Sequence, residues 1–370
     1  MSTPTAIRLT DLSRDYGGKA AVDGIDLTVP QGAFLVLLGP SGCGKTTTLR
    51  MLAGLETPTG GQIELSGSVV ATGASGDLTP PSRRGAGLVF QSYALWPHMS
   101  VRGNIEWPLK IAKWPKATRS ARADEVMEML AIRQLADRYP GEISGGQQQR
   151  VAIARMIGPE PKVLLFDEPL SNLDAKLRVE TRSELLRIHR LTGATSVYVT
   201  HDQVEAMTMA THIALMRDGR IEQFGSPAEL AEEPRTAFVA TFIGTPPANL
   251  LPGQVQEGRV QVAGVDVGRC ALPDATPVQV MYRAETLRID PGGPLRMEVF
   301  ETSPLAGRWI VTGSVDGRRV SLACDDNPIG VVGSTIGVGL PAHPGAVFDA
   351  TGIRVDPDGV IVTTAPATAP

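Results

Sequence analysis

Cysteine is scarce in this sequence, and long apolar runs are missing from it. Its 370 residues include three cysteines, Cys43, Cys270 and Cys324, which lie far apart and lack the paired spacing of a zinc site or a disulfide framework. Nowhere do the ~18 consecutive apolar residues of a membrane span occur. The first residues, "MSTPTAIRLTDL", lack the basic and apolar segments of an export signal. We therefore expect a protein of the reducing cytoplasm that does not cross a membrane.

The sequence also has little excess of either charge. The formal net charge is -4 at pH 7, with a pI near 5.8. No run of lysine and arginine is dense enough to follow a phosphate backbone, so we expect no nucleic acid as a main partner. The glycine and proline content stays below the roughly 25–30 % that is typical of low-complexity chains. At ~100–200 residues per domain, this length predicts two or three folded domains.

Continuous apolar runs predict the buried strands of a parallel sheet. Residues 33–38 (AFLVLL), 162–169 (KVLLFDEP) and 195–202 (TSVYVTHD) have this pattern, and helical stretches lie between them. This alternation indicates an α/β fold with right-handed crossovers. Residues 6–13 and 20–29 instead alternate polar and apolar side chains, as half-exposed antiparallel strands do.

Two segments interrupt this α/β pattern. Residues 92–155 contain several helical segments and no buried strand, which predicts a helical insertion between core strands. The proline-rich stretch 245–253 (TPPANLLPG) marks a boundary, after which short β-like runs follow, with a hairpin signal at Asp316-Gly317. We therefore expect domains at residues 1–245 and 246–370, the second mostly β.

The stretch "GPSGCGKTT", which starts at Gly39, predicts a phosphate-binding loop. Gly39, Gly44, Lys45 and Thr46 match G-x-x-x-x-G-K-[ST]. Glycines let the backbone curl around phosphates, the lysine adds a cation, and the Thr46 hydroxyl is a ligand for Mg²⁺. A fortuitous glycine turn is the alternative, which the buried strand before the loop and the helix after it disfavour. Cys43 is either an inert small residue of the loop or a thiol activated by nearby positive charge.

Polar residues follow the predicted buried strands, where the ligand crevice of a parallel sheet lies. Asp167 and Glu168 end one strand, and we expect Asp167 to hold Mg²⁺ and Glu168 to accept a proton from an attacking water. His201 and Gln91 follow two other strands and would reach the same crevice. Taken singly, these residues read as a solvated strand end, a surface histidine and a loop amide. The upstream phosphate loop favours catalysis.

A second possible phosphate site lies at residues 143–157 (ISGGQQQRVAIARMI). Ser144 is a suitable helix N-cap, glycines follow it, and apolar positions continue the helix. The free amides at such a helix start, with the serine hydroxyl, suit a γ-phosphate. An ordinary capped helix with a flexible lead is the alternative, and this motif alone does not exclude it.

In this order, the motifs resemble those of the nucleotide-binding subunit of an ATP-binding cassette (ABC) transporter, over nearly all of the first 245 residues. The resemblance implies an ATPase that uses ATP and Mg²⁺, with Tyr16 stacked on adenine, Asp174 at the dimer loop, and Lys45, Gln91, Glu168 and His201 as catalytic residues. The implied metal residues are Thr46, Gln91 and Asp167. The implied nucleotide-binding residues are Tyr16, Gly39, Ser41, Gly42, Cys43, Gly44, Lys45, Thr46, Thr47, Gln91, Ser144, Gly145, Gly146, Gln147, Asp167 and Asp174.

Longer stretches are similar to the ATPase subunits of bacterial carbohydrate importers of the maltose and glycerol-3-phosphate type. These stretches are residues 89–105, 167–178, 198–208 and 242–251. The resemblance implies a C-terminal β-rich accessory domain of OB-like (TOBE) type. The sequence departs from the group at "MYRAETLRI" (281–289), which puts any particular regulatory contact in doubt, and at Ile143, where leucine is usual. The second change conserves volume, so we expect no loss of function from it.

The resemblance also implies an assembly. In this family two cassettes close head to tail, so that the phosphate loop of one chain and the signature Ser144–Gln147 of the other hold each ATP. The implied partners are a second copy of the chain or a similar ATPase subunit, two membrane permease subunits and, indirectly, a periplasmic or extracellular solute-binding protein. The implied location is peripheral, on the cytoplasmic face of the inner membrane.

Four other functions are weighed against this one. A polyamine or ferric-ion importer subunit is the nearest alternative, since the sequence does not specify the solute. A soluble cassette ATPase acting on ribosomes or DNA usually carries two cassettes or a long coiled coil, and this chain has neither. A regulatory module without turnover has no need of Asp167, Glu168 and His201 together. An exporter subunit is disfavoured by residues 88–105 and by the tail.

Overall fold

The computed structural model describes residues 4–73, 76–171, 173–356 and 367–368. The chain forms two compact units, Met1–Pro227 with Pro366–Pro370, and Ala228–Ala365. The boundary expected between residues 245 and 246 falls inside the second of these units. The division of the chain into domains at residues 1–245 and 246–370 stays a prediction.

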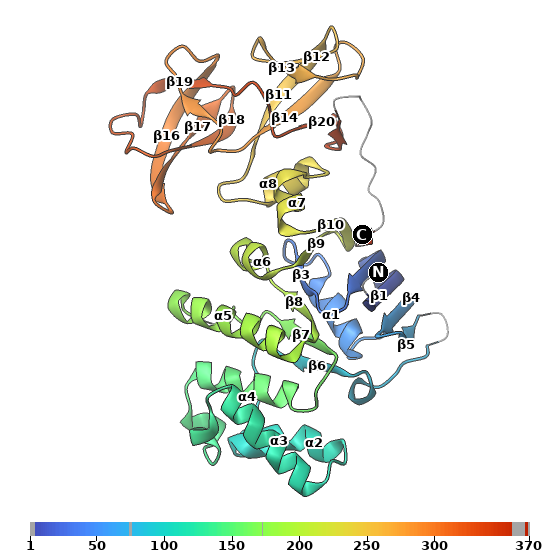
Figure 1. The fold of residues 1–370 in the computed structure, drawn as a ribbon. Helices are drawn as coiled ribbons and strands as arrows, with labels where there is room; N and C mark the ends of the chain where they lie inside the picture. The colour runs from blue at the N-terminus through green and yellow to red at the C-terminus, as the bar shows by residue number, and fades with distance from the viewer. Residues whose placement is uncertain (1–3, 74–75, 172, 357–366, 369–370) are drawn as a thin grey trace. The chain divides into compact units, whose positions relative to one another are not determined.

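A six-stranded, mostly parallel sheet forms the centre of the first unit (Figure 1). Its strands are β3 (Phe34–Leu38), β6 (Ala86–Val89), β7 (Val163–Asp167), β8 (Thr195–Val199), β9 (His212–Arg217) and β10 (Arg220–Gly225), in the order β10-β9-β3-β8-β7-β6. All pairs are parallel except β9 with β10. Every residue of β3, β7 and β8 is buried, as the continuous apolar runs predict.

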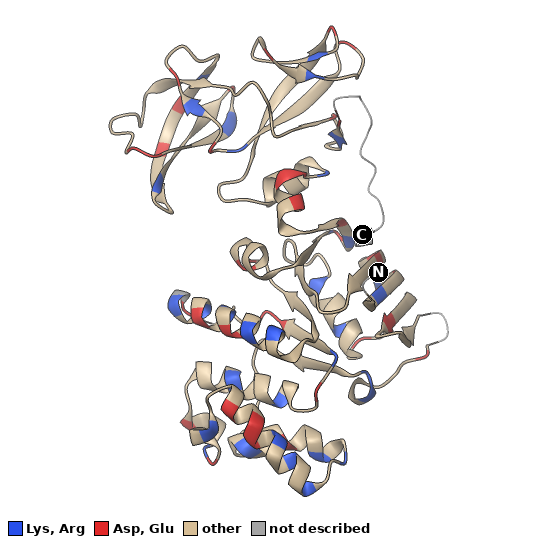
Figure 2. Cartoon of the chain, viewed as in Figure 1, with Lys and Arg blue, Asp and Glu red and all other residues tan. Residues whose placement is uncertain are grey.

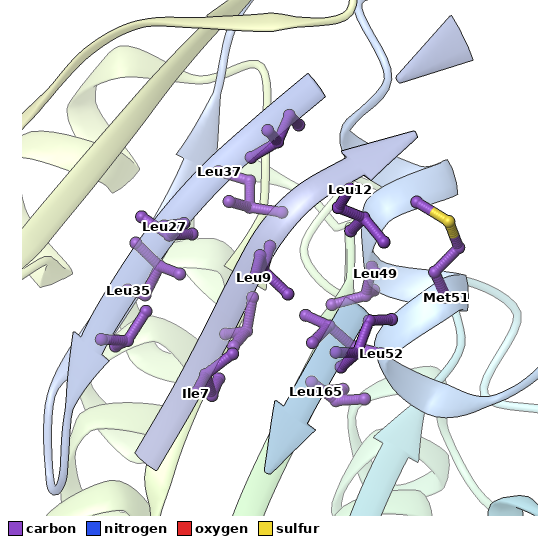
Figure 3. Close-up of a cluster of buried hydrophobic side chains, with 14 of the residues drawn as sticks. Ile7, Leu9, Leu12, Leu27, Leu35, Leu37, Leu49, Met51, Leu52 and Leu165 are labelled. Atoms are coloured by element: carbon purple, nitrogen blue, oxygen red, sulfur yellow. The ribbon is translucent and has the colours of Figure 1, made fainter. Parts of the chain in front are cut away.

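A second, largely antiparallel sheet packs on α1 and the central sheet. Its strands are β1 (Thr5–Asp15), β2 (Ala20–Pro30), β4 (Gly60–Leu65), β5 (Ser68–Thr72) and the parallel β22 (Ala367–Thr368), in the order β22-β2-β1-β4-β5. Figure 3 shows the core between these layers, where Leu9 and Leu12 meet Leu37, Leu49 and Leu165. This core holds the start of α1 against the end of β3, and so it positions the phosphate loop.

Helices occupy the faces of the central sheet and the predicted insertion. They are α1 (Lys45–Ala53), α2 (Val101–Ile111), α3 (Lys116–Met129), α4 (Gly145–Ile157), α5 (Ala175–Thr192) and α6 (Gln203–Met209), with the 3₁₀ turns Pro81–Arg83, Arg133–Leu135 and Pro140–Glu142. The insertion is helical, as expected: α2, α3 and α4 follow one another between β6 and β7. Figure 2 shows both signs of charge along α3 and α5. On α5, Arg187 and Glu184 form an ion pair at 2.7 Å. Across the described ranges, no helix has the length and apolar character needed to cross a bilayer.

The second unit is mostly β, as predicted. Two short helices, α7 (Pro227–Glu232) and α8 (Ala237–Phe242), precede two antiparallel sheets. The first sheet contains β11 (Asn249–Gln256), β12 (Arg259–Val262), β13 (Val265–Arg269), β14 (Pro277–Tyr282), β20 (Ala346–Phe348) and β21 (Arg354–Val355). The second contains β15 (Arg288–Ile289), β16 (Leu295–Leu305), β17 (Arg308–Val315), β18 (Arg318–Cys324) and β19 (Thr335–Gly339).

These sheets share one apolar core, which includes Tyr282, Met297 and Leu322. Asp316 and Gly317, both with positive φ, form the predicted turn between β17 and β18. The fold class is therefore the expected one: an α/β core with an antiparallel β subdomain and a helical insertion, followed by a β-rich region.

Candidate functional site

The loop between β3 and α1 needs glycine at two of the predicted positions. Gly39 and Gly44 have φ values of 148° and 102°. A Cβ on Gly39 would lie 2.2 Å from the Met216 carbonyl oxygen, and one on Gly44 would lie 2.3 Å from the Ala21 carbonyl oxygen. No side chain fits at such distances, so the curled loop depends on these two glycines. Ser41 and Gly42 lie exposed at its tip, and Thr46 and Thr47 are half-buried in the first turn of α1.

Lys45 is a buried cation at the base of this loop. Its side chain is 5 % exposed, and its Nζ donates to the carbonyl oxygens of Gly39 at 2.8 Å and Pro40 at 2.9 Å. Both partners are neutral, so the ammonium charge is not balanced by either. A buried cation is costly unless an anion lies near it, and the phosphates of a nucleotide supply one. The loop and Lys45 therefore fit a phosphate group.

Cys43 lies buried in the same loop, with its Sγ 3.6 Å from Lys45 Nζ. Burial raises the pKa of the thiol and outweighs the opposing effect of Lys45. The thiolate is the reactive form of cysteine, so positive charge does not activate Cys43 at neutral pH. Of the two interpretations of Cys43, the structure favours the inert small residue.

Alkylation of Cys43 is expected to be slow near pH 7, to accelerate as the pH rises, and to abolish ATP binding, because the added group would occupy the phosphate cradle. Prior incubation with MgATP is expected to protect the thiol. Mass spectrometry of maleimide-treated protein, with and without MgATP, measures modification at each cysteine, and the partly exposed Cys324 serves as the internal control. Equal modification of Cys43 with and without nucleotide would contradict this placement.

Asp167 ends β7 beside the phosphate loop. Its Oδ1 accepts a hydrogen bond from the Thr46 hydroxyl at 3.3 Å, and the residue is 8 % exposed. Burial raises the pKa of the Asp167 carboxyl above its ordinary value, although Arg50 and Thr46 oppose the shift. A buried carboxylate next to a hydroxyl is a donor set that Mg²⁺ accepts when phosphate oxygens and waters complete it. These two residues therefore fit the metal that the sequence predicts.

Replacement of Asp167 by asparagine is expected to raise the melting temperature of the nucleotide-free protein at pH 7.5. A raised pKa means that the ionised carboxylate destabilises the fold, and this cost grows as the pH rises through the folded-state pKa. Removing it is expected to add about 2–4 °C for each ~1 kcal/mol gained. Differential scanning fluorimetry at a series of pH values from 7.5 downward measures the effect, which is expected to shrink as the pH falls through the raised folded-state pKa of Asp167. The exposed Asp137 offers the matched control, Asp137→Asn, which is expected to leave the melting temperature unchanged. An unchanged or lowered melting temperature in Asp167→Asn would refute the destabilising effect of the Asp167 carboxylate.

Glu168 and His201 come together at the edge of the central sheet. Glu168 follows β7 with a left-handed φ of 44°, and His201 follows β8. The Nδ1 atom of His201 lies 3.4 Å from the Glu168 Oε2 atom. A left-handed backbone at a glutamate is strained, and such strain clusters at functional sites. The adjacent ends of β7 and β8 therefore bring an acid and an imidazole together, as the strand-end argument predicts.

Gln91 is connected to Glu168 through the hydroxyl of a serine. Its Nε2 donates to the Ser171 hydroxyl at 3.1 Å, and that hydroxyl donates to the Glu168 carbonyl oxygen at 2.9 Å. Ser171 was not among the residues predicted from the sequence. Its position three residues after Glu168 is the signal that could have identified it, since serine hydroxyls bond backbone carbonyls three residues back in turns.

The segment that carries His201 is held by a buried acid that the sequence reasoning also missed. Glu205, 4 % exposed in α6, accepts hydrogen bonds at its Oε2 from the Tyr198 hydroxyl at 2.8 Å and from the Thr200 hydroxyl at 2.7 Å. Asp202 caps α6 by accepting from the Val204 amide at 2.7 Å. These bonds tie the end of β8 to the start of α6 and limit the freedom of His201 between them.

Ser144 begins α4 as the predicted N-cap. Its Oγ accepts from the Gln147 amide at 3.4 Å, and the Gln147 Oε1 accepts from the Ser144 amide at 2.9 Å, a reciprocal capping box. Gly145 and Gly146 form the first helical positions, and a Cβ on Gly146 would contact Leu177 at 3.4 Å. A groove of about 240 Å³ lies between α4 and α5, lined in part by Ser144, Gly146 and Gln147. The predicted signature therefore forms a capped helix start beside a groove.

Two residues implied only by the family resemblance lie at the surface. Tyr16 is 58 % exposed, and the Arg14 guanidinium carbon lies 4.5 Å from its ring centroid. An exposed aromatic ring beside a cation is free to stack on a base. Asp174 is the N-cap of α5 and accepts from the Leu177 amide at 2.9 Å. The described residues include no group of three or more histidine, cysteine or acidic side chains that could hold a metal ion unaided.

Comparison with known proteins agrees with this geometry. Residues 22–171 match the sequence profile of the ABC transporter family. The chain is 44 % identical over 345 residues to the sn-glycerol-3-phosphate import ATP-binding protein UgpC 1 of Rhizobium johnstonii, covering 90 % of this chain and 91 % of that protein. It is 53 % identical over 251 residues to the trehalose/maltose import ATP-binding protein MalK of Thermococcus litoralis, covering 68 % of each.

Solved structures of ATP-binding cassettes also match this chain, over its first unit. The dimeric post-hydrolysis state of the ATP-binding cassette MJ0796, bound to ADP and Pi, is 31 % identical with a TM-score of 0.53, covering 60 % of this chain and 98 % of that one. The match confirms the fold of the first unit. The chain therefore belongs to the ABC transporter family and is one of its ATP-hydrolysing subunits.

Proposed function

We propose that this chain hydrolyses ATP to power the import of glycerol-3-phosphate or a sugar- or polyol-like solute through membrane permeases. One observation carries the solute class: the identity with the glycerol-3-phosphate import protein covers 90 % of this chain. It therefore extends beyond the cassette into the β-rich second unit. The trehalose/maltose import protein supports the same broad class.

We assign the nucleotide site to the loop between β3 and α1. The glycine-dependent curl and the buried Lys45 receive the β- and γ-phosphates, with Ser41, Gly42, Cys43 and Thr47 in the same cradle. Tyr16 stacks on the adenine. Thr46 and Asp167, with Gln91 as a further ligand, would hold Mg²⁺, which would neutralise charge on the phosphate oxygens.

Hydrolysis needs a base, and Glu168 is placed for that role. Its carboxylate takes a proton from the water that attacks the γ-phosphorus, while the bond to the ADP oxygen breaks. His201, 3.4 Å from Glu168 at its Nδ1, keeps this carboxylate in place and reaches toward the γ-phosphate side of the crevice. Gln91 orients the attacking water. The hydrogen bond from Gln91 Nε2 to the Ser171 hydroxyl holds the Gln91 amide in place. Positioning and charge neutralisation supply most of the rate in phosphoryl transfer.

We place the chain in a head-to-tail homodimer, or in a dimer with a closely similar ATPase subunit. Each ATP then lies between the phosphate loop of one chain and Ser144, Gly145, Gly146 and Gln147 of the other, with Asp174 at the contact. The dimeric cassette among the solved relatives supports this arrangement. Two permease subunits would hold the dimer at the cytoplasmic face of the inner membrane, and a solute-binding protein would act through them.

Two measurements test this function. Phosphate release by the purified chain in MgATP measures hydrolysis, and the absence of any ATP-dependent phosphate release would overturn the proposal. Differential scanning fluorimetry of any solute-binding protein found encoded next to this chain, screened against glycerol-3-phosphate, maltose, trehalose, spermidine and Fe³⁺, identifies the solute. Stabilisation by spermidine or Fe³⁺ alone would overturn the carbohydrate class.

A further inference from the structure

An arginine near the end of α4 holds the loop that follows Gln91. The Nη1 atom of Arg155 donates to the Ala94 carbonyl oxygen at 2.7 Å, and its Nη2 donates to the Tyr93 carbonyl oxygen at 2.8 Å. Its guanidinium carbon also lies 4.7 Å from the Trp96 ring centroid. One planar guanidinium thus donates hydrogen bonds to two successive carbonyls and stacks on the ring of a third residue. Lysine cannot reproduce this set of contacts.

The backbone that Arg155 contacts, at Tyr93 and Ala94, is strained. Tyr93 and Ala94 have φ values of 61° and 45°, so two adjacent residues with side chains adopt the left-handed conformation. That conformation is unfavourable for such residues and persists only when the surroundings enforce it. Tyr93 is also buried, with a hydroxyl that has no hydrogen-bond partner. Burial lowers the pKa of the Arg155 guanidinium, so this charge has given up hydration in order to make the contacts.

Arg155 lies on the same helix as Ser144, at its opposite end. The two are eleven positions apart, which spans about 16 Å of α-helix. The loop that Arg155 holds starts two residues after Gln91, whose amide bonds Ser171 and through it the backbone of Glu168. Asn104 of α2 holds the other end of the loop by accepting from the Trp96 amide at 2.9 Å. A continuous set of contacts therefore runs from the signature end of α4 to the residues around Glu168.

We propose that Arg155 is a positioning residue that couples, through α4, the signature Ser144–Gln147 to the loop after Gln91. This rests on the proposed function, in which Ser144 serves the partner's ATP and Gln91 serves the chain's own. Movement of Ser144 on nucleotide binding shifts α4, and the Arg155 contacts carry that shift to the loop after Gln91. Without them the strained loop relaxes and Gln91 no longer follows α4.

Hydrogen exchange tests this coupling without hydrolysis. In the Glu168→Gln protein, ATP is expected to slow amide exchange in residues 39–47, 144–150 and 91–96 together. After Arg155→Ala or Arg155→Lys, the first two segments are expected to keep their protection and residues 91–96 to lose it. In the background with Glu168 intact, Arg155→Ala is expected to lower kcat about tenfold with KM for ATP within about twofold, since misplacing a catalytic group by a fraction of an ångström has this scale of effect.

Arg122 provides the matched control. It also donates from its guanidinium to backbone carbonyls at the end of α4, those of Gly158 at 3.1 Å and Ile157 at 3.3 Å, and it makes none of the contacts to residues 93–96 described for Arg155. Arg122→Ala is expected to leave all three protected segments as in the parent protein.

The remaining outcomes separate two failures. If ATP protects none of the three segments in the Glu168→Gln protein itself, the proposed ATP site is wrong. The coupling alone is overturned if ATP protects residues 39–47 and 144–150 but not 91–96 in that parent, or protects all three in the Arg155 variants. It is also overturned if the Arg155 variants lose protection in residues 144–150 as well as 91–96, or if Arg122→Ala reproduces their pattern, because either result marks a general structural role.

Discussion

Replacement of Glu168 by glutamine is expected to lower kcat for ATP hydrolysis by about 10²–10⁴-fold, the usual contribution of a general base, while ATP binding stays close to that of the parent protein. Glutamine has nearly the shape of glutamate but cannot accept the proton of an attacking water. The phosphate loop, Lys45 and Asp167 are left intact, so the nucleotide contacts persist. Phosphate release under saturating MgATP and equilibrium binding of ATP measure the two quantities separately.

The second unit offers a matched control for this substitution. Glu257 also has a left-handed backbone, with φ of 50°, but it lies in the turn between β11 and β12. Glu257→Gln therefore repeats the same chemical change at a similarly strained backbone and is expected to leave kcat unchanged. Hydrolysis by Glu168→Gln at the parent rate would remove Glu168 from its assigned role.

A mixture of Lys45→Ala and Ser144→Arg chains is expected to recover ATPase activity that neither variant shows alone. Lys45→Ala removes the buried cation of the phosphate loop. Ser144→Arg removes the capping hydroxyl and places a bulky side chain at the start of α4. If each ATP is held between two chains, the mixed dimer contains one site with both defects and one site with neither.

Symmetry sets the size of this recovery. Random pairing of equal amounts makes half of the dimers mixed, and each has one intact site of two, so the activity regained is at most about a quarter of the parent's. Phosphate release measured after mixing, against each variant alone at the same total concentration, gives the result. The expected recovery combines two claims: each site is shared between two chains, and one intact site is sufficient for turnover. A mixture of Lys45→Ala with Lys45→Arg chains forms the control, since both variants damage the phosphate loop and no pairing restores it. A mixture that stays as inactive as its components would contradict a shared site that turns over with one intact copy.

Much of the fold could be predicted because it depends on local patterns. The apolar runs of β3, β7 and β8 contain only buried residues, and the glycines of the phosphate loop are required by backbone geometry within a few residues of chain. The capping box at Ser144 and Gln147 is equally local, because both bonds join residues three apart. Periodicity and short-range sterics are sufficient for such features.

The contacts that orient the site were harder to predict. Ser171 and Glu205 were missed because a serine and a glutamate in such positions are ordinary surface residues, and only the folded chain buries Glu205 against Tyr198 and Thr200. Arg155 was taken simply as part of a helix. Its partners at residues 93 and 94 lie more than sixty positions away, so no periodic pattern relates them.

The sequence by itself determined the classes of residue and the elements that carry them: a glycine-rich loop between a buried strand and a helix, acids and an imidazole after buried strands, and a capped helix start within a helical insertion. Only the tertiary structure decided which of these meet. The parallel pairing of β7 and β8 sets Glu168 beside His201, and the packing of α4 against the loop after Gln91 sets Arg155 on two strained carbonyls. The physical reason is that strand and helix formation depends on near neighbours, whereas a site is made by groups distant in the chain that a common core brings within hydrogen-bonding distance.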